Sequence, residues 1–412
     1  MKRLGAMILE EPYRLFFPVG MLAGVWGVLM WPLFYGGHLL FYPGEAHARI
    51  MVGGFMGAFV AGFLGTAFPR LVGARKWRAA EFGAILVAWL LMVFFWSRGM
   101  VPAGDKSFTG MIALLFGGML VRVMRGRMDT PPPGFVLVFA GLAGAAISAW
   151  YLSRGRFDSV ESWRFARLFF HQGFLLLPAM GIGPYLLPRF FGKPSTHAFE
   201  TSVRIPAGWW KRFGLSLVAG ALVVVSFFIE ARDAAMPGQI LRAVAMTAWF
   251  AWETPVLRRA VAGTTPGTAV RWALGSMSMG LVCAALWPHA RVGSLHLFFV
   301  SGLGLLTMTV GTRVILGHAG RHDLLGGKII WLRWAIGLVL LAAVTRMTSD
   351  FIPAVRVSHH IYAAWTWIAA CAVWLIALFP YFLRNEEKPA RIRQCSRWFA
   401  GKRRPEPVNP LS

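Results

Sequence analysis

Apolar runs of about twenty residues recur along almost the whole chain, and they constrain its fold more than any other feature. A run of that length can cross the hydrocarbon layer of a bilayer as a helix. A helix satisfies its backbone hydrogen bonds within the segment, as the lipid interior requires. Of the 412 residues, 57% are hydrophobic and only 14% are charged, which is too apolar for a soluble protein of this size. We therefore expect an all-α, polytopic transmembrane bundle.

Twelve such segments can be counted, and the loops between them are too short to hide a soluble domain. We expect residues 1–383 to form one transmembrane domain of about twelve helices, and residues 384–412 to form a basic, disordered cytoplasmic tail. No strict sequence repeat is visible. The expected spans are 14–35, 47–69, 80–97, 108–124, 134–152, 168–191, 213–230, 237–256, 268–287, 293–316, 328–346 and 359–383.

The basic residues are concentrated in alternate loops, which sets the expected orientation. The chain carries 42 Lys and Arg residues and a formal net charge of +25. With both termini placed in the cytoplasm, most of these residues lie on the cytoplasmic side, as the positive-inside rule requires. A cytoplasmic surface rich in Lys and Arg lies next to anionic lipid headgroups. The expected partner of this charge is thus the lipid bilayer and not nucleic acid, for which no recognisable binding module is present.

The segment Leu295–Arg321 combines a spanning length with several polar residues. It opens on His296, carries Arg313 within its apolar run and closes on the GHAGR turn. A charge inside lipid is costly unless it faces protein or water, so this helix is expected to face inward. His296 and His318 are separated by roughly 33 Å of helix. The two histidines therefore lie near opposite membrane faces and cannot bind the same metal ion.

The remaining histidines are distributed unevenly between the two faces. With the topology above, the outer ends of spans two, six, ten and twelve carry His47, His171, His296 and the pair His359 and His360. Histidines at one depth on facing helices can hold the iron of haem. They can also bind copper, with methionine sulfur as a further soft ligand. The alternative is that each is only an interfacial polar residue near the headgroups.

Two charged residues within the expected spans have open roles. Arg49 follows His47 by two residues, so the two side chains point to different sides of a helix. Its guanidinium suits a haem propionate or a lipid phosphate, both of which it can bind in bidentate fashion. Glu253 is a carboxylate at membrane depth, expected to act as a proton relay or to pair with Arg242 or Arg313.

Two stretches resemble the signature motifs of the NnrS family. Arg313–Arg321, RVILGHAGR, is similar to the R-x-x-LGHTGR motif, and His47–Gly73 is similar to a run that begins HxHEM and ends PxWTG. The resemblance implies a protein of twelve spans that contains b-type haem and copper in the bacterial inner membrane. It also implies a link to nitric-oxide stress and denitrification, with nitric oxide as a small gaseous ligand.

The chain departs from these motifs at four positions, two of them within HxHEM. Arg49 replaces the second histidine and Ile50 replaces the glutamate; Leu71 replaces the tryptophan, and Ala319 replaces the threonine. If the second histidine is a metal ligand in the family, this member has lost one metal or takes a ligand from His359 or His360. Copper is accordingly less secure than haem.

The motif residues of the inner side have a separate set of expected roles. Arg313 and Arg321 are expected either to hold an anion, such as the propionates of a second cofactor, or to lock the inner loop. His318 is a further candidate metal ligand on that side.

Three functions remain open from the sequence. The first is a haem-binding membrane protein, with or without copper, that acts on nitric oxide or protects against it, in the manner of a membrane oxidoreductase. The second is a transporter or channel, suggested by Arg313, Glu253 and the proline-rich sixth span. The third is a non-catalytic membrane subunit that docks a redox or assembly partner.

Overall fold

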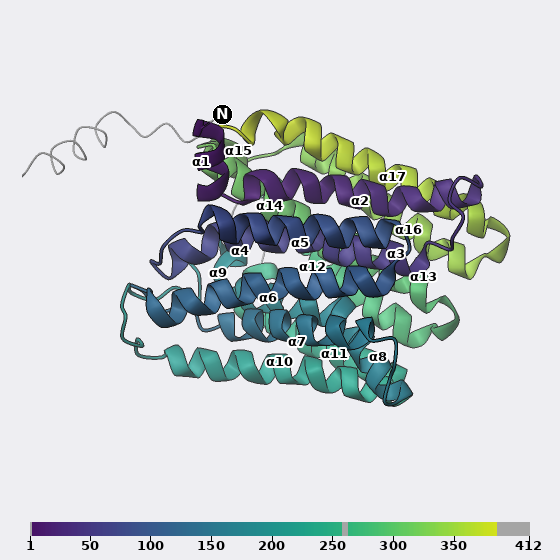
Figure 1. Ribbon diagram of the computed structural model, residues 1–412, viewed down its shortest axis with the longest axis horizontal. Helices are drawn as coiled ribbons and strands as arrows, with labels where there is room; N and C mark the ends of the chain where they lie inside the picture. Colours follow the sequence, from purple (N-terminus) through teal and green to yellow (C-terminus); the bar gives the residue numbers. More distant parts are fainter. Residues whose placement is uncertain (1, 258–262, 385–412) are drawn as a thin grey trace, which may run out of the picture.

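The computed structural model describes residues 2–257 and 263–384, and every regular element in those ranges is a helix. Eleven of these helices are long and apolar enough to cross a membrane, which confirms the expected polytopic bundle. They run roughly side by side along the long axis of the molecule (Figure 1). The expected tail, 384–412, lies outside the described residues except for Arg384.

A short helix, α1 (Lys2–Glu10), precedes three successive groups of four spans. The first group consists of α2 (Tyr13–Tyr35), the continuous span α3–η1–α4 (Gly44–Arg49, Ile50–Met56 and Gly57–Leu71), α5 (Ala79–Ser97) and α6 (Val101–Arg125). The second consists of α7 (Phe135–Ser153), the span α8–η2–α9–η3 (Val160–Leu168, Phe169–Gly173, Phe174–Leu186 and Leu187–Phe191), α10 (Trp209–Ala231) and α11 (Ala235–Glu253).

The third group closes the bundle. It consists of α12 (Thr265–Leu286), the span η5–α13–η6–α14 (Pro288–Ala290, Arg291–His296, Leu297–Gly304 and Leu305–His318), α16 (Ile330–Phe351) and α17 (Arg356–Leu378). The short helices η4 (Pro255–Leu257), α15 (His322–Leu325), η7 (Pro353–Val355) and η8 (Phe379–Tyr381) lie in the connections or at the end of this order.

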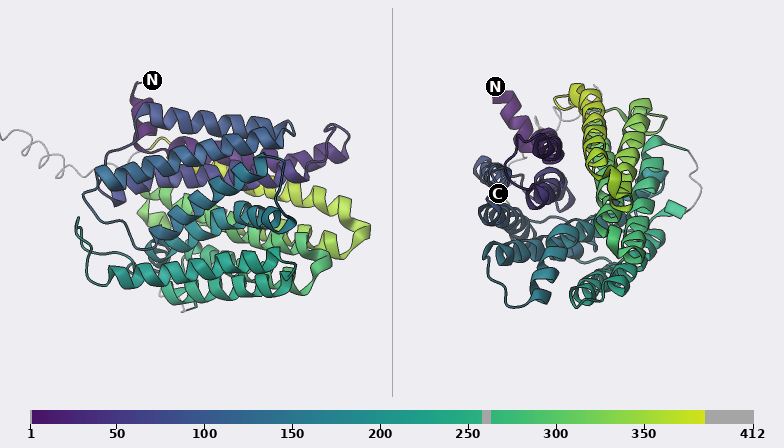
Figure 2. Two further views of the ribbon diagram at one scale, coloured as in Figure 1. Left: turned by 60° about the horizontal axis from the view of Figure 1, so that its bottom comes forward. Right: turned by 90° about the vertical axis from the view of Figure 1, so that its right-hand side faces the viewer.

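The three groups are arranged in a ring with the same internal packing. In each group the third and fourth spans pack together as a hairpin, and the first span packs on the second. The fourth span of one group then packs against the first span of the next, as α6 on α7 and α11 on α12. Because α17 packs against α2, the ring closes on itself, as the end-on view in Figure 2 illustrates.

The second span of each group occupies the centre of this ring. In the apolar 18-residue window of these three spans, 83%, 72% and 67% of the residues are buried inside the protein, against at most 56% for any other candidate span. Each central span contains a π-helical segment, η1, η2 or η6, and is followed within two residues by a glycine with positive φ. Gly73, Gly192 and Gly320 supply that left-handed conformation, which lacks a steric penalty only for glycine.

Helix α11 occupies the place of the twelfth expected span but is less apolar than the other eleven. Its Arg242 is fully buried, and the guanidinium donates to Glu230 Oε2 at 2.6 Å and to Gln172 Oε1 at 2.7 Å. Arg242 therefore pairs with Glu230 and not with Glu253, contrary to the expectation. Glu253 instead accepts from Arg212 at 2.7 Å and from Thr196 at 2.7 Å.

The proline-rich sixth span is not broken at its prolines. Helix α9 runs as α-helix through Pro178 and Pro184 and passes into a 3₁₀ turn at Leu187–Phe191. The ring of Pro178 packs against Gly141 on α7, where a side chain would collide with it. Pro178 thus lies where α9 packs closely against α7.

Candidate functional site: a histidine cavity at the outer end

A cavity of about 290 Å³ is lined by residues of α3, η2, α13 and α17, among others. The labels of α3 and α13 mark this end of the bundle in Figure 1. Four of the five expected outer histidines line it, one from each of spans two, six, ten and twelve of the chain. Its walls are otherwise mainly apolar, with Trp31 and Trp367 among the larger side chains. The lining histidines are His47 on α3, His171 in η2, His296 on α13 and His360 on α17.

Three of these imidazoles are held in the same way, through Nδ1 and a backbone carbonyl. Since a carbonyl can only accept, Nδ1 must carry the proton, and the neutral ring keeps its lone pair on Nε2. A buttressed Nδ1 and a free Nε2 are the usual state of a metal-binding histidine. The bonds are His47 to Gly27 O at 2.9 Å, His171 to Arg167 O at 2.8 Å and His296 to Val292 O at 2.7 Å.

The fourth imidazole, His360, is oriented by a side chain. Its Nδ1 lies 2.8 Å from the hydroxyl of Tyr35 on α2. The Nε2 atoms of His360 and His171 are both buried and have no hydrogen-bond partner in the protein. An unpaired buried polar atom is costly, so two such atoms in one cavity indicate a group that satisfies them.

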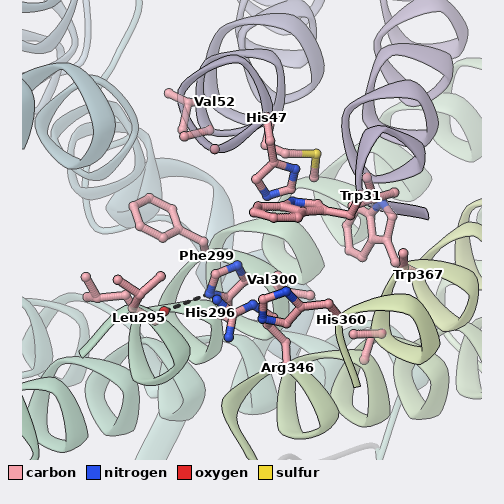
Figure 3. A pocket seen from close by; sticks show the side chains of 18 of the residues that line it. Trp31, His47, Val52, Leu295, His296, Phe299, Val300, Arg346, His360 and Trp367 are labelled. Carbon is pink, nitrogen blue, oxygen red and sulfur yellow. Dashed lines mark hydrogen bonds between the residues drawn. The ribbon is translucent and has the colours of Figure 1, made fainter. Parts of the chain in front are cut away.

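His47 and His296 have the most specific mutual geometry. Their ring centres are 6.4 Å apart and their planes differ by only 14°. Two imidazoles that share one metal ion through bonds of about 2.0–2.1 Å have ring centres about 6 Å apart. Figure 3 shows His47 on one side of the cavity and His296 with His360 on the other.

The local helix geometry changes next to three of the four histidines. The π-helical segment η1 begins three residues after His47, η2 contains His171, and η6 begins directly after His296. Segments of π-helix are rare and are often found at functional sites. No sequence pattern known to us marks them, so this feature could not be expected in advance.

Arg346 on α16 is a cavity residue that sequence reasoning missed. Its guanidinium donates to Ser349 Oγ at 2.7 Å and to Asp350 Oδ1 at 2.8 Å, and Figure 3 shows it beside His296 and His360. It stands at the end of the expected span 328–346, so the reasoning applied to Arg313 would have selected it. A guanidinium there can bind a carboxylate or another anion.

His359 and Arg49, both expected at the site, do not line the cavity. The ring of His359 lies 6.0 Å from that of Tyr362. Arg49 is buried against α6, where its Nε and Nη2 donate to the two carboxylate oxygens of Asp105 at 2.8 and 3.1 Å. The residue at the position of the second motif histidine is thus committed to an ion pair.

The motif residues of the inner side lie at the other end of the central spans. Arg313 stacks over Phe190 of η3, with Cζ 4.9 Å from the ring centre. Arg321 donates to both oxygens of Asp323, at 2.9 and 2.8 Å, and these hydrogen bonds lower the pKa of Asp323 to about 2. Arg321 also donates to the Tyr381 hydroxyl at 3.2 Å, so it ties the inner loop to the end of the last span.

His318 is engaged at both ring nitrogens. Its Nδ1 lies 2.8 Å from Val314 O, whereas its Nε2 contacts Arg70 and lies 3.7 Å from Glu11 Oε1. Burial alone would raise the pKa of Glu11, but the hydrogen bond from Arg70 and the charge of Arg14 bring it below its ordinary value. This group of residues is an ion-pair cluster that fastens the N-terminal segment to the bundle.

Within residues 2–257 and 263–384, no three His, Cys, Asp or Glu side chains gather closely enough to hold a metal ion by themselves. The cavity therefore offers pairs of imidazoles and not a complete set of protein ligands. That arrangement suits a group that brings most of the metal's ligands with it.

A comparison with known protein families finds a match, which spans almost the same residues as the helical bundle. The model of one family, described as "NnrS protein", matches residues 7–386, which is nearly the whole chain. No curated protein matches the sequence.

Proposed function

Because this multi-pass membrane protein belongs to the NnrS family, which is linked to the nitric-oxide response, we propose that its outer cavity binds haem. One observation carries the proposal: four imidazoles from four spans line one cavity, and for three of them the Nδ1 bond leaves Nε2 as the nitrogen available there. Haem supplies four in-plane nitrogens and needs only one or two protein ligands, which fits the absence of a three-ligand cluster among the described residues.

The protein's own residues would orient and retain the group. The carbonyls of Gly27 and Val292 fix the rings of His47 and His296 and raise their basicity as ligands. Arg346, itself held by Asp350, is placed to pair with a carboxylate such as a propionate. When bound, haem would supply an iron that carries one electron or, with a single protein ligand, offers an open position to a diatomic gas.

Copper is the second candidate, and a specific observation favours it. Met51 and Met56 line the same cavity as the four histidines, and a thioether is a soft ligand suited to copper. Arg49 stands where the family's motif has its second histidine and is paired with Asp105, so one expected copper ligand is missing. We therefore rank haem before copper.

The location follows from the same proposal. We place the chain in the bacterial inner membrane with both termini in the cytoplasm and the histidine cavity toward the outer face. The ligand would then be a small gas such as nitric oxide. Electrons would come from a redox partner protein.

The proposal is tested by the absorption spectrum and metal content of the purified protein, produced in cells supplied with ample haem and copper. We expect a Soret band, about one or more haems per chain, and a spectral shift when nitric oxide is added to the reduced protein. Copper without haem would replace the first candidate by the second. A colourless protein without bound metal would contradict both.

A further inference from the structure

A second cavity, of about 120 Å³, lies among the same three central spans, deeper in the bundle than the histidine cavity. Helices α4, α9 and α14 form most of its wall, and their labels stand left of centre in Figure 1. Apart from Phe17 on α2, all its lining residues come from the second spans of the three groups. They are Met56, Phe59, Val60, Phe63, Leu64, Leu175, Pro178, Ala179, Ile182, Gly183, Leu186, Leu187, Leu303, Leu306, Thr307 and Val310.

The inner cavity adjoins the histidine cavity at a single side chain. Met56, at the end of η1, lines both of them. A methionine side chain has three rotatable bonds and adapts readily to its surroundings. Because Met56 is common to both linings, movement of its side chain is the simplest change that could connect the two cavities.

The lining selects for apolar occupants. No charged side chain contributes to it, and Thr307 is its only residue with a polar side chain. An ion placed there would lose its hydration without compensation, which costs many kcal/mol. A water molecule needs two to four polar partners, whereas enclosed apolar cavities of about 150 Å³ stay dry and bind xenon or benzene. The inner cavity is partly open, so its lining favours an apolar occupant without sealing it from the surroundings.

We propose that the inner cavity is a binding site for a small, uncharged, apolar gas molecule, from which the gas reaches the histidine cavity past Met56. The binding half of this statement is independent of the proposed function. The delivery half rests on it, because it assumes that a gas ligand is used at the histidines. The apolar lining also makes a route through the inner cavity unsuited to the transport of ions.

Xenon tests the binding half, because it is an apolar probe of suitable size that does not need haem. Crystals of the full-length protein under xenon pressure should show an anomalous peak among Ala179, Ile182 and Leu306. The peak should vanish in Ala179→Trp, which fills the cavity, and should strengthen in Val310→Ala, which enlarges it. The matched control is Ala221→Trp, since Ala221 is exposed on the outer face of α10.

The delivery half is tested by gas kinetics in the haem-loaded protein. After photolysis, the bimolecular rebinding of carbon monoxide should slow at least tenfold in Ala179→Trp and stay unchanged in Ala221→Trp. If Ala179→Trp does not fold, the test rests on Val310→Ala. This variant enlarges the cavity and should give a stronger xenon peak and faster rebinding of carbon monoxide.

The possible failures are distinguishable. A protein without haem that binds xenon among these residues would overturn the proposed function and leave the gas site standing. A haem-loaded protein whose inner cavity takes no xenon, or holds a lipid or detergent chain, would overturn the gas site. Xenon binding with unaltered rebinding rates in both cavity variants would overturn delivery alone.

Discussion

His296 and His318 lie at opposite ends of one central span, and their surroundings differ in one decisive respect. Each ring is oriented through Nδ1 by a carbonyl four residues earlier, Val292 or Val314. At the outer end, Nε2 of His296 belongs to a cavity shared with His47 and His360. At the inner end, Nε2 of His318 contacts Arg70 and Glu11. The same local geometry thus builds a candidate ligand at one end and a structural fastener at the other.

The comparison shows that likeness to a motif does not by itself identify a ligand. The RVILGHAGR stretch carries the stronger resemblance, yet its His318 and Arg321 have protein partners at their functional atoms. The outer histidines of the cavity differ because no protein group is hydrogen-bonded to their Nε2 atoms. An imidazole with a buttressed Nδ1 and no protein partner at Nε2 is ready to bind something else.

The largest expected effect is on haem content, and it should differ between histidine variants at the outer and inner ends of the central spans. Replacing His47 or His296 by alanine removes an Nε2 from the cavity and should lower haem affinity at least tenfold, since even indirect ligand partners contribute that much. His318→Ala should keep the haem content of the wild type. Haem per chain, measured in the purified variants, checks this. An equal loss of haem in His318→Ala and His47→Ala would contradict the assigned difference between the two ends of the span.

The next effect concerns the arginine at the motif's second histidine position. Asp105→Ala would leave the buried Arg49 with only the half-exposed Glu45 as a carboxylate partner and should cost about 3 kcal/mol of folding free energy. Thermal unfolding in detergent measures this loss. The double variant Arg49→Met with Asp105→Leu should recover part of it, because the ion pair is replaced by apolar side chains while Trp96 Nε1 loses its acceptor, Asp105 Oδ1. Asp323→Ala breaks an exposed ion pair, which contributes at most about 1 kcal/mol, so it serves as the control and should lower the unfolding temperature much less.

A smaller effect is expected at the two arginines that accompany the histidines. Arg346→Gln should speed haem release about tenfold, since a charge-assisted hydrogen bond contributes about 1.5–3 kcal/mol. Arg313→Gln should not change the rate, because Arg313 stacks on Phe190 at the inner end. Transfer of haem to an excess of apomyoglobin measures both rates. An effect confined to Arg313→Gln would place the anion at the wrong end for this account.

The smallest effect is a pH dependence of the inner cluster. Its ion pairs hold the pKa of Glu11 below 4.5, so their contribution to stability is complete above about pH 4.5. It is lost as the pH falls through the lower pKa of the folded state. The unfolding temperature should fall by about 1–2 °C more in the wild type than in Glu11→Gln between pH 6 and pH 3. Identical pH profiles would show that the cluster does not fasten the N-terminal segment.

Much of the fold follows from the sequence because bilayer thickness sets a length that apolar runs must match. All twelve expected spans correspond to helices, including α11, whose hydropathy falls short of the others. The threefold grouping was not visible, although His47, His171 and His296 recur about 125 residues apart. Helix packing in lipid depends on shape more than on residue identity, so repeated groups can diverge until no repeat can be read.

The candidate site was only partly predictable, for a related reason. Topology alone placed His47, His171, His296 and His360 at one depth, and the structure brings all four to one cavity. Topology could not say which way a side chain points around its helix, and so His359 was included. Pairing partners were equally hidden: Asp105 lies 56 residues from Arg49 in the sequence.

The structure of the haem-loaded protein, determined by electron cryomicroscopy in a lipid nanodisc, tests the central claim most directly. The account predicts a macrocycle in the outer cavity, with its iron bonded to Nε2 of His47 or His296 and Arg346 close to a propionate. A macrocycle bound elsewhere, with the four imidazoles of the cavity left without a ligand, would contradict it.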